Sequence, residues 1–244
     1  MLDFASTKGK IVDAALRLAA TSGWNGLGLG QIAQEAGIGL AEFRKEFSSK
    51  SDILAAYTRM VDDAVLAKVG AADPTLSSRD RLFDVLMTRF ELMTPHKPGL
   101  RRIATDLRLS PGESVAQLSV AARSIYWMLA AAGIDAEGGR GALRVPGVMN
   151  IYARVFDIWL EDDDAGLART MAALDSRLRR GERFVQRLDD IGAAASRFFS
   201  GLKSGGGGKR QGASPEPDDT QPASGPGQPP QPPSAGEPGP SPTL

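Results

Sequence analysis

Cysteine is absent from the 244 residues, and histidine occurs once, at position 96. Without cysteine the chain can form neither disulfide bonds nor thiolate metal sites. A single histidine argues against multi-histidine metal centres and against histidine catalysis. The sequence also offers no nucleophile–base pair, phosphate-binding loop or metal-ligand spacing, so we expect no enzyme and no cofactor.

Long apolar runs and excess charge are missing as well. No stretch approaches the roughly 20 uninterrupted apolar residues of a membrane-spanning helix, and residues 1–10 hold no apolar segment of signal-peptide length. Basic and acidic residues number 29 each, so no global field steers the chain towards nucleic acid or membrane. We therefore expect a cytoplasmic protein.

Apolar residues, which make up 42% of the chain, recur at helical spacing. Strand-like alternation and internal repeats are not evident, so the pattern predicts an all-α protein. Its C-terminal end is rich in Pro, Gly, Ser and Gln, a composition that cannot bury a core. We predict a three-helix domain over 1–60, a helical bundle over 61–180, an amphipathic helix over 181–203 and a disordered tail over 204–244.

The most informative segment runs over 10–51. Its first helix should end at Gly23, a residue typical of helix C-termini. Two short helices over 29–36 and 40–47 should follow, with Gly37 in the turn between them. This layout is a helix-turn-helix, which holds one short helix so that it can enter a DNA major groove.

The helix expected over 40–47 has two distinct faces. Leu40, Phe43 and Phe47 are three and four residues apart, so they should form one buried face. A fourth helix should start at Ile53, after a cap at Ser51 or Asp52. The outward face of the 40–47 helix then comprises Ala41, Glu42, Arg44, Lys45 and Glu46.

This N-terminal segment resembles the TetR family of one-component transcriptional regulators. The family usually has Thr at the position of Gly28, and aromatic residues near Arg44 to Glu46, which this chain lacks. The residues that carry the resemblance are Ile11, Ala14, Ala15, Leu18, Gly23, Ile32, Ala33, Ala36, Gly37, Ile38, Phe47, Lys50 and Leu54.

The resemblance implies a ligand-responsive regulator, a repressor, that binds double-stranded DNA as a homodimer. The first three helices would bind DNA, and the rest would form the dimer interface and the pocket for an apolar effector. The residues expected at the DNA are Lys10, Gly39, Leu40, Ala41, Glu42, Arg44, Lys45 and Lys50.

The remaining helices should cover 79–93, 100–109, 114–132, 148–160 and 164–180. The helix over 114–132 is mostly apolar, so it should be buried on most sides. A group of large apolar residues could line the effector pocket or simply fill the core. It comprises Tyr126, Trp127, Met128, Tyr152, Phe156 and Trp159.

A second resemblance covers parts of 152–178, which look like the ubiquinone-biosynthesis accessory proteins that share the TetR fold. Those proteins bind isoprenoid lipid rather than DNA and end in an amphipathic membrane helix. The alternative function is therefore lipid binding in ubiquinone or isoprenoid metabolism. The corresponding helix could contact a membrane, a second subunit or the core through Phe184, Leu188, Ile191, Phe198, Phe199 and Leu202.

An aspartate run at 162–164 and the single histidine are two further candidate sites. Asp162, Asp163 and Asp164 could suggest a divalent metal, but no partner carboxylates at ligand spacing support one. We therefore interpret them as a loop and a helix N-cap. His96 lies in Thr-Pro-His-Lys-Pro, which predicts an exposed turn.

Overall fold

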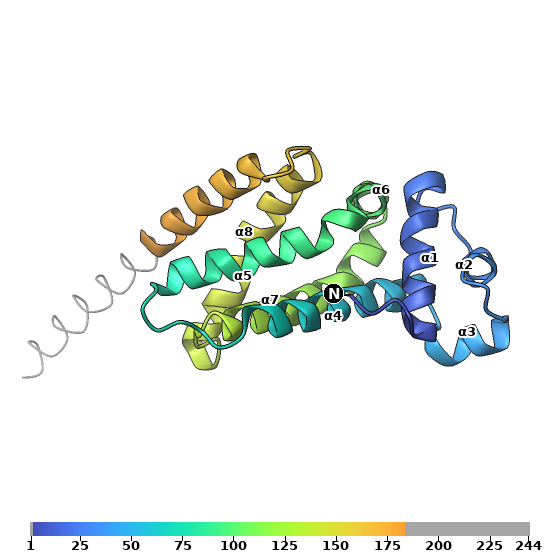
Figure 1. The fold of residues 1–244 in the computed structure, drawn as a ribbon, viewed down its shortest axis with the longest axis horizontal. Coiled ribbons are helices and arrows are strands. Elements are labelled where there is room, and N and C mark those ends of the chain that lie inside the picture. The colour runs from blue at the N-terminus through green and yellow to red at the C-terminus, as the bar shows by residue number, and fades with distance from the viewer. Residues whose placement is uncertain (1, 184–244) are drawn as a thin grey trace, which may run out of the picture. The chain divides into compact units, whose positions relative to one another are not determined.

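The computed structural model describes residues 2–183, and every regular element among them is a helix (Figure 1). The all-α prediction is therefore confirmed. The predicted amphipathic helix and tail lie outside the described residues. The elements are α1 (Thr7–Ser22), α2 (Leu29–Glu35), α3 (Leu40–Glu46), α4 (Lys50–Val69), α5 (Ser78–Met93), a 3-10 turn (Thr94–His96), α6 (Lys97–Arg108), α7 (Pro111–Ala131), α8 (Gly138–Leu160) and a last helix over 168–183.

Serine side chains fix where three of these helices begin. Ser6 accepts a hydrogen bond from the Gly9 amide at 3.1 Å and so caps α1. Ser49 and Ser77 cap α4 and α5 in the same way, which satisfies amides that a helix start leaves free. The fourth helix thus begins at Lys50, three residues before the predicted start, because the serine hydroxyl at 49 provides the cap.

Helix α4 links the N-terminal helices to the bundle. It packs against α1 on one side and against α5 and α7 on the other. The core is continuous along it, from Trp24 in the α1–α2 loop to Phe90 and Trp159 in the bundle, all three fully buried.

A buried polar cluster sits inside the bundle. Arg89 of α5 donates to the carboxylate of Asp62 of α4, and both residues are less than a tenth exposed. Ser124 donates to the same carboxylate at 2.7 Å, and the Arg89 Nε donates to the Tyr152 hydroxyl at 3.0 Å. Four helices, α4, α5, α7 and α8, are therefore joined by one set of satisfied hydrogen bonds.

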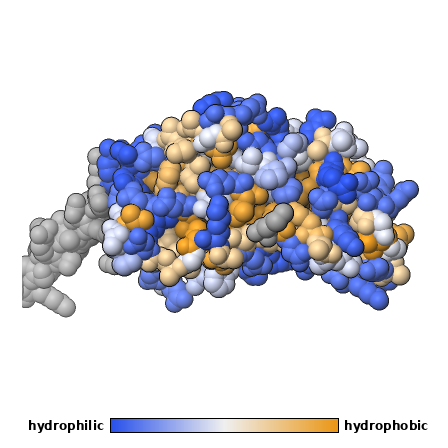
Figure 2. Space-filling view, in the orientation of Figure 1, coloured by the Kyte–Doolittle hydropathy of each residue, from blue (hydrophilic) through white to orange (hydrophobic). Residues whose placement is uncertain are grey.

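Helix α7 is less buried than its apolar sequence predicts. Val115 is 65% exposed, Leu118 53% and Trp127 46%. The prediction of burial on most sides is wrong: α7 packs on α4, α5, α6 and α8, while these three side chains stay exposed. On the face shown in Figure 2, apolar and hydrophilic residues are interspersed.

Prolines lie both at helix starts and, in one case, inside a helix. Pro98 lies in the first turn of α6, where its missing N–H costs nothing. Helix α8 begins at Gly138, ten residues before the predicted start, and contains Pro146 in its interior. Its neighbour Gly147 and Pro146 itself are exposed, so water can satisfy the carbonyl that the proline ring leaves free.

The single histidine and the aspartate run at 162–164 are each partly buried. His96 is half-buried, with its ring 5.2 Å from that of Phe4 and 5.6 Å from that of Tyr57, so the prediction of an exposed turn is wrong. Asp162 is buried and accepts from the amide and hydroxyl of Thr170, while Asp164 accepts from the Ala168 amide at the start of the last helix.

Residues 2–183 contain neither a metal-binding cluster nor a membrane-spanning helix. No group of three or more His, Cys, Asp or Glu side chains is arranged to hold a metal ion. None of the helices there combines the length and apolarity that crossing a bilayer requires.

Candidate nucleic-acid interface

The first helix is the support on which the helix-turn-helix is built. It packs against α2, α3 and α4 through buried side chains such as Ile11 and Ala15. The chain before it crosses its first turn at Gly9, where an added Cβ would lie 2.3 Å from the Asp3 carbonyl oxygen. Glycine is therefore required at this crossing, and the support includes the residues that precede α1.

The α1–α2 loop is held by charged side chains from two other helices. The Lys50 ammonium of α4 donates to the Trp24 carbonyl at 2.8 Å and lies 5.2 Å from the Trp24 ring. The Asp106 carboxylate of α6 accepts from the Trp24 amide at 2.6 Å and from the Asn25 amide at 3.0 Å. The bonds from Asn25 and Trp24 lower the pKa of Asp106 below its ordinary value, since they favour the charged form.

The turn between α2 and α3 depends on glycine and backbone bonds. Gly37 has a φ of +69°, a conformation that side chains rarely adopt, and the Ile38 amide donates to the Ala33 carbonyl at 2.9 Å. At the other end of α2, Gly28 has no side chain, but its amide donates to the Gln31 side-chain oxygen at 2.8 Å. The side chain of Gln31 thus anchors a helix start that lacks a capping hydroxyl or carboxylate.

Helix α3 is attached mainly through its aromatic residues. Phe43 and Phe47 are buried, with ring centroids 6.2 Å apart. Leu40, predicted on the same buried face, is 62% exposed, so that prediction is wrong. Leu40 is the first residue of α3. This end of the helix extends beyond the core that buries Phe43 and Phe47.

Charged groups on the exposed surface fall into two sets. Arg17 donates to both Asp13 and Glu35, at 3.0 and 2.8 Å, so its charge is neutralised locally. Among the described residues, Arg44 and Lys45 have no carboxylate within ion-pair distance, and the same holds for Lys10. These cations therefore remain available to an anionic partner.

Seven of the eight residues predicted to contact DNA are exposed on this part of the molecule. Among them, Glu42 accepts from the Thr7 hydroxyl at 3.3 Å, which ties α3 to α1. The eighth, Lys50, is half-buried and is used inside the protein as described above. The exposed seven are Lys10, Gly39, Leu40, Ala41, Glu42, Arg44 and Lys45.

The six residues considered for an effector pocket do not form one group. Tyr152, Phe156 and Trp159 stack in series along α8, with centroid separations of 6.0 and 5.4 Å. Trp127 is 46% exposed, and Tyr126 points its hydroxyl towards Glu137. The sixth residue, Met128, is fully buried beside the Arg89 guanidinium. Pocket lining stays a prediction for these residues.

Asp106 is a positioning residue of the candidate site that the sequence did not reveal. It joins the bundle to the α1–α2 loop across more than 80 residues of chain, and neither its neighbours nor its spacing signals that contact. The sequence likewise does not indicate that Gly99 of α6 contacts α1. An added Cβ at Gly99 would lie 2.4 Å from the Leu16 carbonyl oxygen.

Comparison with known proteins agrees with this geometry. Residues 11–57 match the family model described as "Bacterial regulatory proteins, tetR family". No curated protein sequence matches the chain.

Solved structures of TetR regulators share the fold. A TetR transcriptional regulator from Nitrosomonas europaea ATCC 19718 is 20% identical, with a TM-score of 0.57, over 72% of this chain and 98% of that one. A TetR transcriptional regulator from Rhodococcus sp. RHA1 is 16% identical, with a TM-score of 0.50, over 72% of this chain and 94% of that one. At these identities the likeness concerns the fold. The chain therefore carries the helix-turn-helix domain of the TetR family, on a fold that it shares with TetR-family transcriptional regulators.

Proposed function

We propose that the protein is a transcriptional repressor that binds double-stranded DNA through α2 and α3. The observation that carries this proposal is the pair Arg44 and Lys45. Both are exposed on α3, and neither has an acidic partner among the described residues. Phosphate contacts of this kind supply most of the non-specific affinity for DNA.

The first turn of α3 would read the bases. Leu40 is an exposed apolar residue at the start of the helix, and such a side chain suits the methyl group of thymine. Glu42, the first charged residue of α3, is also exposed. Its carboxylate could accept a hydrogen bond from the amino group of cytosine in the major groove. Lys10 and Lys45 would hold the helix on the phosphates.

The working unit would be a homodimer. Two copies of α3 about 34 Å apart would enter successive major grooves on one side of the duplex. The assembly would then recognise a two-fold symmetric site.

An apolar effector in the bundle would act on DNA binding through α4 and α6. Helix α4 carries Lys50 near one end and Asp62 of the buried cluster in its middle. Helix α6 carries Asp106, which holds the α1–α2 loop. A ligand that favours a different packing of these helices would shift the population away from the DNA-binding arrangement.

The test is binding to DNA that flanks the protein's own gene, measured by electrophoretic shift from 50 to 200 mM salt. Arg44→Ala and Lys45→Ala should weaken binding, and each should reduce the slope of log affinity against log salt by about 1 if the residue contacts phosphate. Lys50→Ala is a poor test, because that lysine holds the α1–α2 loop.

The matched control is Arg123→Ala, which removes an exposed cation of α7 that is not part of the helix-turn-helix. It should leave both affinity and slope unchanged. Binding that is absent, or that depends on Arg123 as much as on Arg44, would contradict the proposal.

A further inference from the structure

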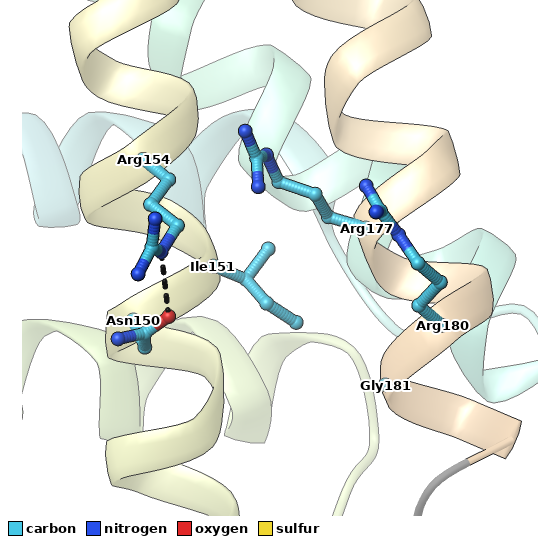
Figure 3. A pocket seen from close by; sticks show the side chains of 6 residues that line it. All are labelled: Asn150, Ile151, Arg154, Arg177, Arg180 and Gly181. Carbon is cyan, nitrogen blue, oxygen red and sulfur yellow. Dashed lines mark hydrogen bonds between the residues drawn. The ribbon is translucent and has the colours of Figure 1, made fainter.

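A cleft between α8 and the last helix brings three arginine side chains together without an acid. The cleft has a volume of about 260 Å³ and is lined by Asn150, Ile151, Arg154, Arg177, Arg180 and Gly181. Figure 3 shows Arg154 on α8, Arg180 on the last helix, and Arg177 reaching between the two helices. This site shares no residue with the helix-turn-helix.

Two of the guanidiniums are positioned by their own helices. The Arg154 Nε donates to the Asn150 side-chain oxygen at 3.1 Å, and the Arg180 Nε donates to the Ser176 carbonyl at 3.2 Å. Each bond uses one of the five N–H groups of a guanidinium. Their terminal N–H groups are left for another partner.

Arg177 is different, because its Nε is buried and has no hydrogen-bond partner. Burying such a donor without a partner is costly, and native structures rarely do so without a ligand, water or ion. Because the Nε is closed to solvent, an anion in the cleft would meet the terminal N–H groups of Arg177, which are not buried and form no hydrogen bond within residues 2–183.

The carboxylates of the same two helices pair with other arginines. Asp157 of α8 bonds to Arg108, and Asp175 of the last helix bonds to Arg179 at 2.9 Å. Glu182 lies 4.0 Å from Arg79. Within residues 2–183, therefore, no acid forms an ion pair with Arg154, Arg177 or Arg180.

The shape of the cleft limits what can bind. Gly181 lies so close to Ile151 that an added Cβ would be 3.2 Å from its Cδ1 atom, and the isoleucine provides the apolar part of the lining. Ligand pockets for drug-sized molecules usually measure about 300–1,000 Å³, so this cleft suits a small ligand.

We propose that this cleft binds the phosphate group of a small phosphorylated molecule. Guanidinium forks match phosphate oxygens in pairs, and a doubly charged group offsets the repulsion among three arginines better than a single carboxylate does. The proposal is independent of DNA binding, because every contact lies on α8 and the last helix.

The test uses the full-length protein without DNA. Inorganic phosphate, glycerol phosphate and glycerol are titrated by calorimetry at constant ionic strength, with chloride and acetate as competing anions. Both phosphates should bind and raise the melting temperature, whereas glycerol should not. Arg177→Gln and Arg154→Gln should each weaken phosphate binding at least tenfold.

Two control variants distinguish loss of the phosphate site from loss of the folded structure. Arg177→Lys keeps the charge but lacks the fork, so it should bind more weakly than the wild type and better than Arg177→Gln. Arg123→Gln, which removes a cation elsewhere, should bind as the wild type does, and all variants should keep the wild-type circular dichroism.

Three results would overturn the proposal. The first is no phosphate binding at millimolar concentration, and the second is equal binding by the arginine variants. The third is a change from dimer to monomer in Arg177→Gln without any phosphate effect, which would assign the arginines to a subunit contact. None of these outcomes depends on whether the protein binds DNA.

Discussion

An ion-pair cluster on the helix-turn-helix and another inside the bundle place their charges in opposite environments. On the helix-turn-helix, ions lie at the surface, as in the Arg17 pairs with Asp13 and Glu35. Inside the bundle, Asp62 and Arg89 form an ion pair that is almost fully buried. Removing a charge from the exposed Arg17 pairs should therefore cost little stability, whereas removing one from the buried Asp62–Arg89 pair should cost much.

The largest effect is expected at Asp62. Replacing it with alanine leaves the Arg89 charge buried and unpaired and removes the acceptor of Ser124, so the free energy of unfolding should fall by about 3–5 kcal/mol. Urea unfolding measures this loss. The double variant Asp62→Leu/Arg89→Met should recover much of it, and a single-variant loss below about 1 kcal/mol would contradict a buried pair.

The next effect concerns the contact between the two regions. Gly99→Ala would place a Cβ against the Leu16 carbonyl oxygen, forcing α1 and α6 apart at a cost of about 1–3 kcal/mol. Gly30→Ala is the matched control, because nothing lies within 4 Å of a Cβ there. It should be neutral or stabilising, since alanine favours helix; equal losses in both variants would show that the contact is not tight.

A smaller effect is expected for Asp106→Asn, which weakens the bonds to the Trp24 and Asn25 amides by about 1 kcal/mol. The folded pKa of Asp106 is lowered, so its charge stabilises the fold above the unfolded value of about 3.9. That contribution is lost as pH falls through the folded value.

Urea unfolding at several pH values checks this dependence. The difference between wild type and Asp106→Asn should shrink as pH falls below about 4. The exposed Asp84→Asn change in α5 is the control and should show no such difference; a constant difference at all pH values would contradict a role for the carboxylate charge.

The smallest effect is expected at Arg17. Its side chain is 57% exposed, and solvent screening limits such surface pairs to about 0–1 kcal/mol. Arg17→Ala should therefore change the unfolding free energy little, and less at high salt. A loss comparable to that of Asp62→Ala would erase the distinction between the two regions.

Local sequence was enough to predict the elements of the helix-turn-helix. Gly23 and Gly37 mark chain reversals, and Phe43 and Phe47 repeat at helical spacing, so the order of the helices follows from short-range preferences. Leu40 had the same spacing but lies exposed, because periodicity describes a helix face and not how far the core extends along it.

Three-dimensional packing decided which polar groups meet. Lys50, predicted to contact phosphate, also holds the α1–α2 loop, and Asp106 binds the same loop from another helix. The Asp62–Arg89 pair and the three-arginine cleft also join residues that are far apart in the chain.

The sequence by itself therefore determined the all-helical fold and the helix-turn-helix, because helix periodicity, caps and turn glycines act over a few residues. Only the tertiary structure decided which charges are buried, which hold the α1–α2 loop and which remain free. The physical reason is that electrostatic and packing energies depend on distance in space and on exposure to water, and neither follows from position along the chain.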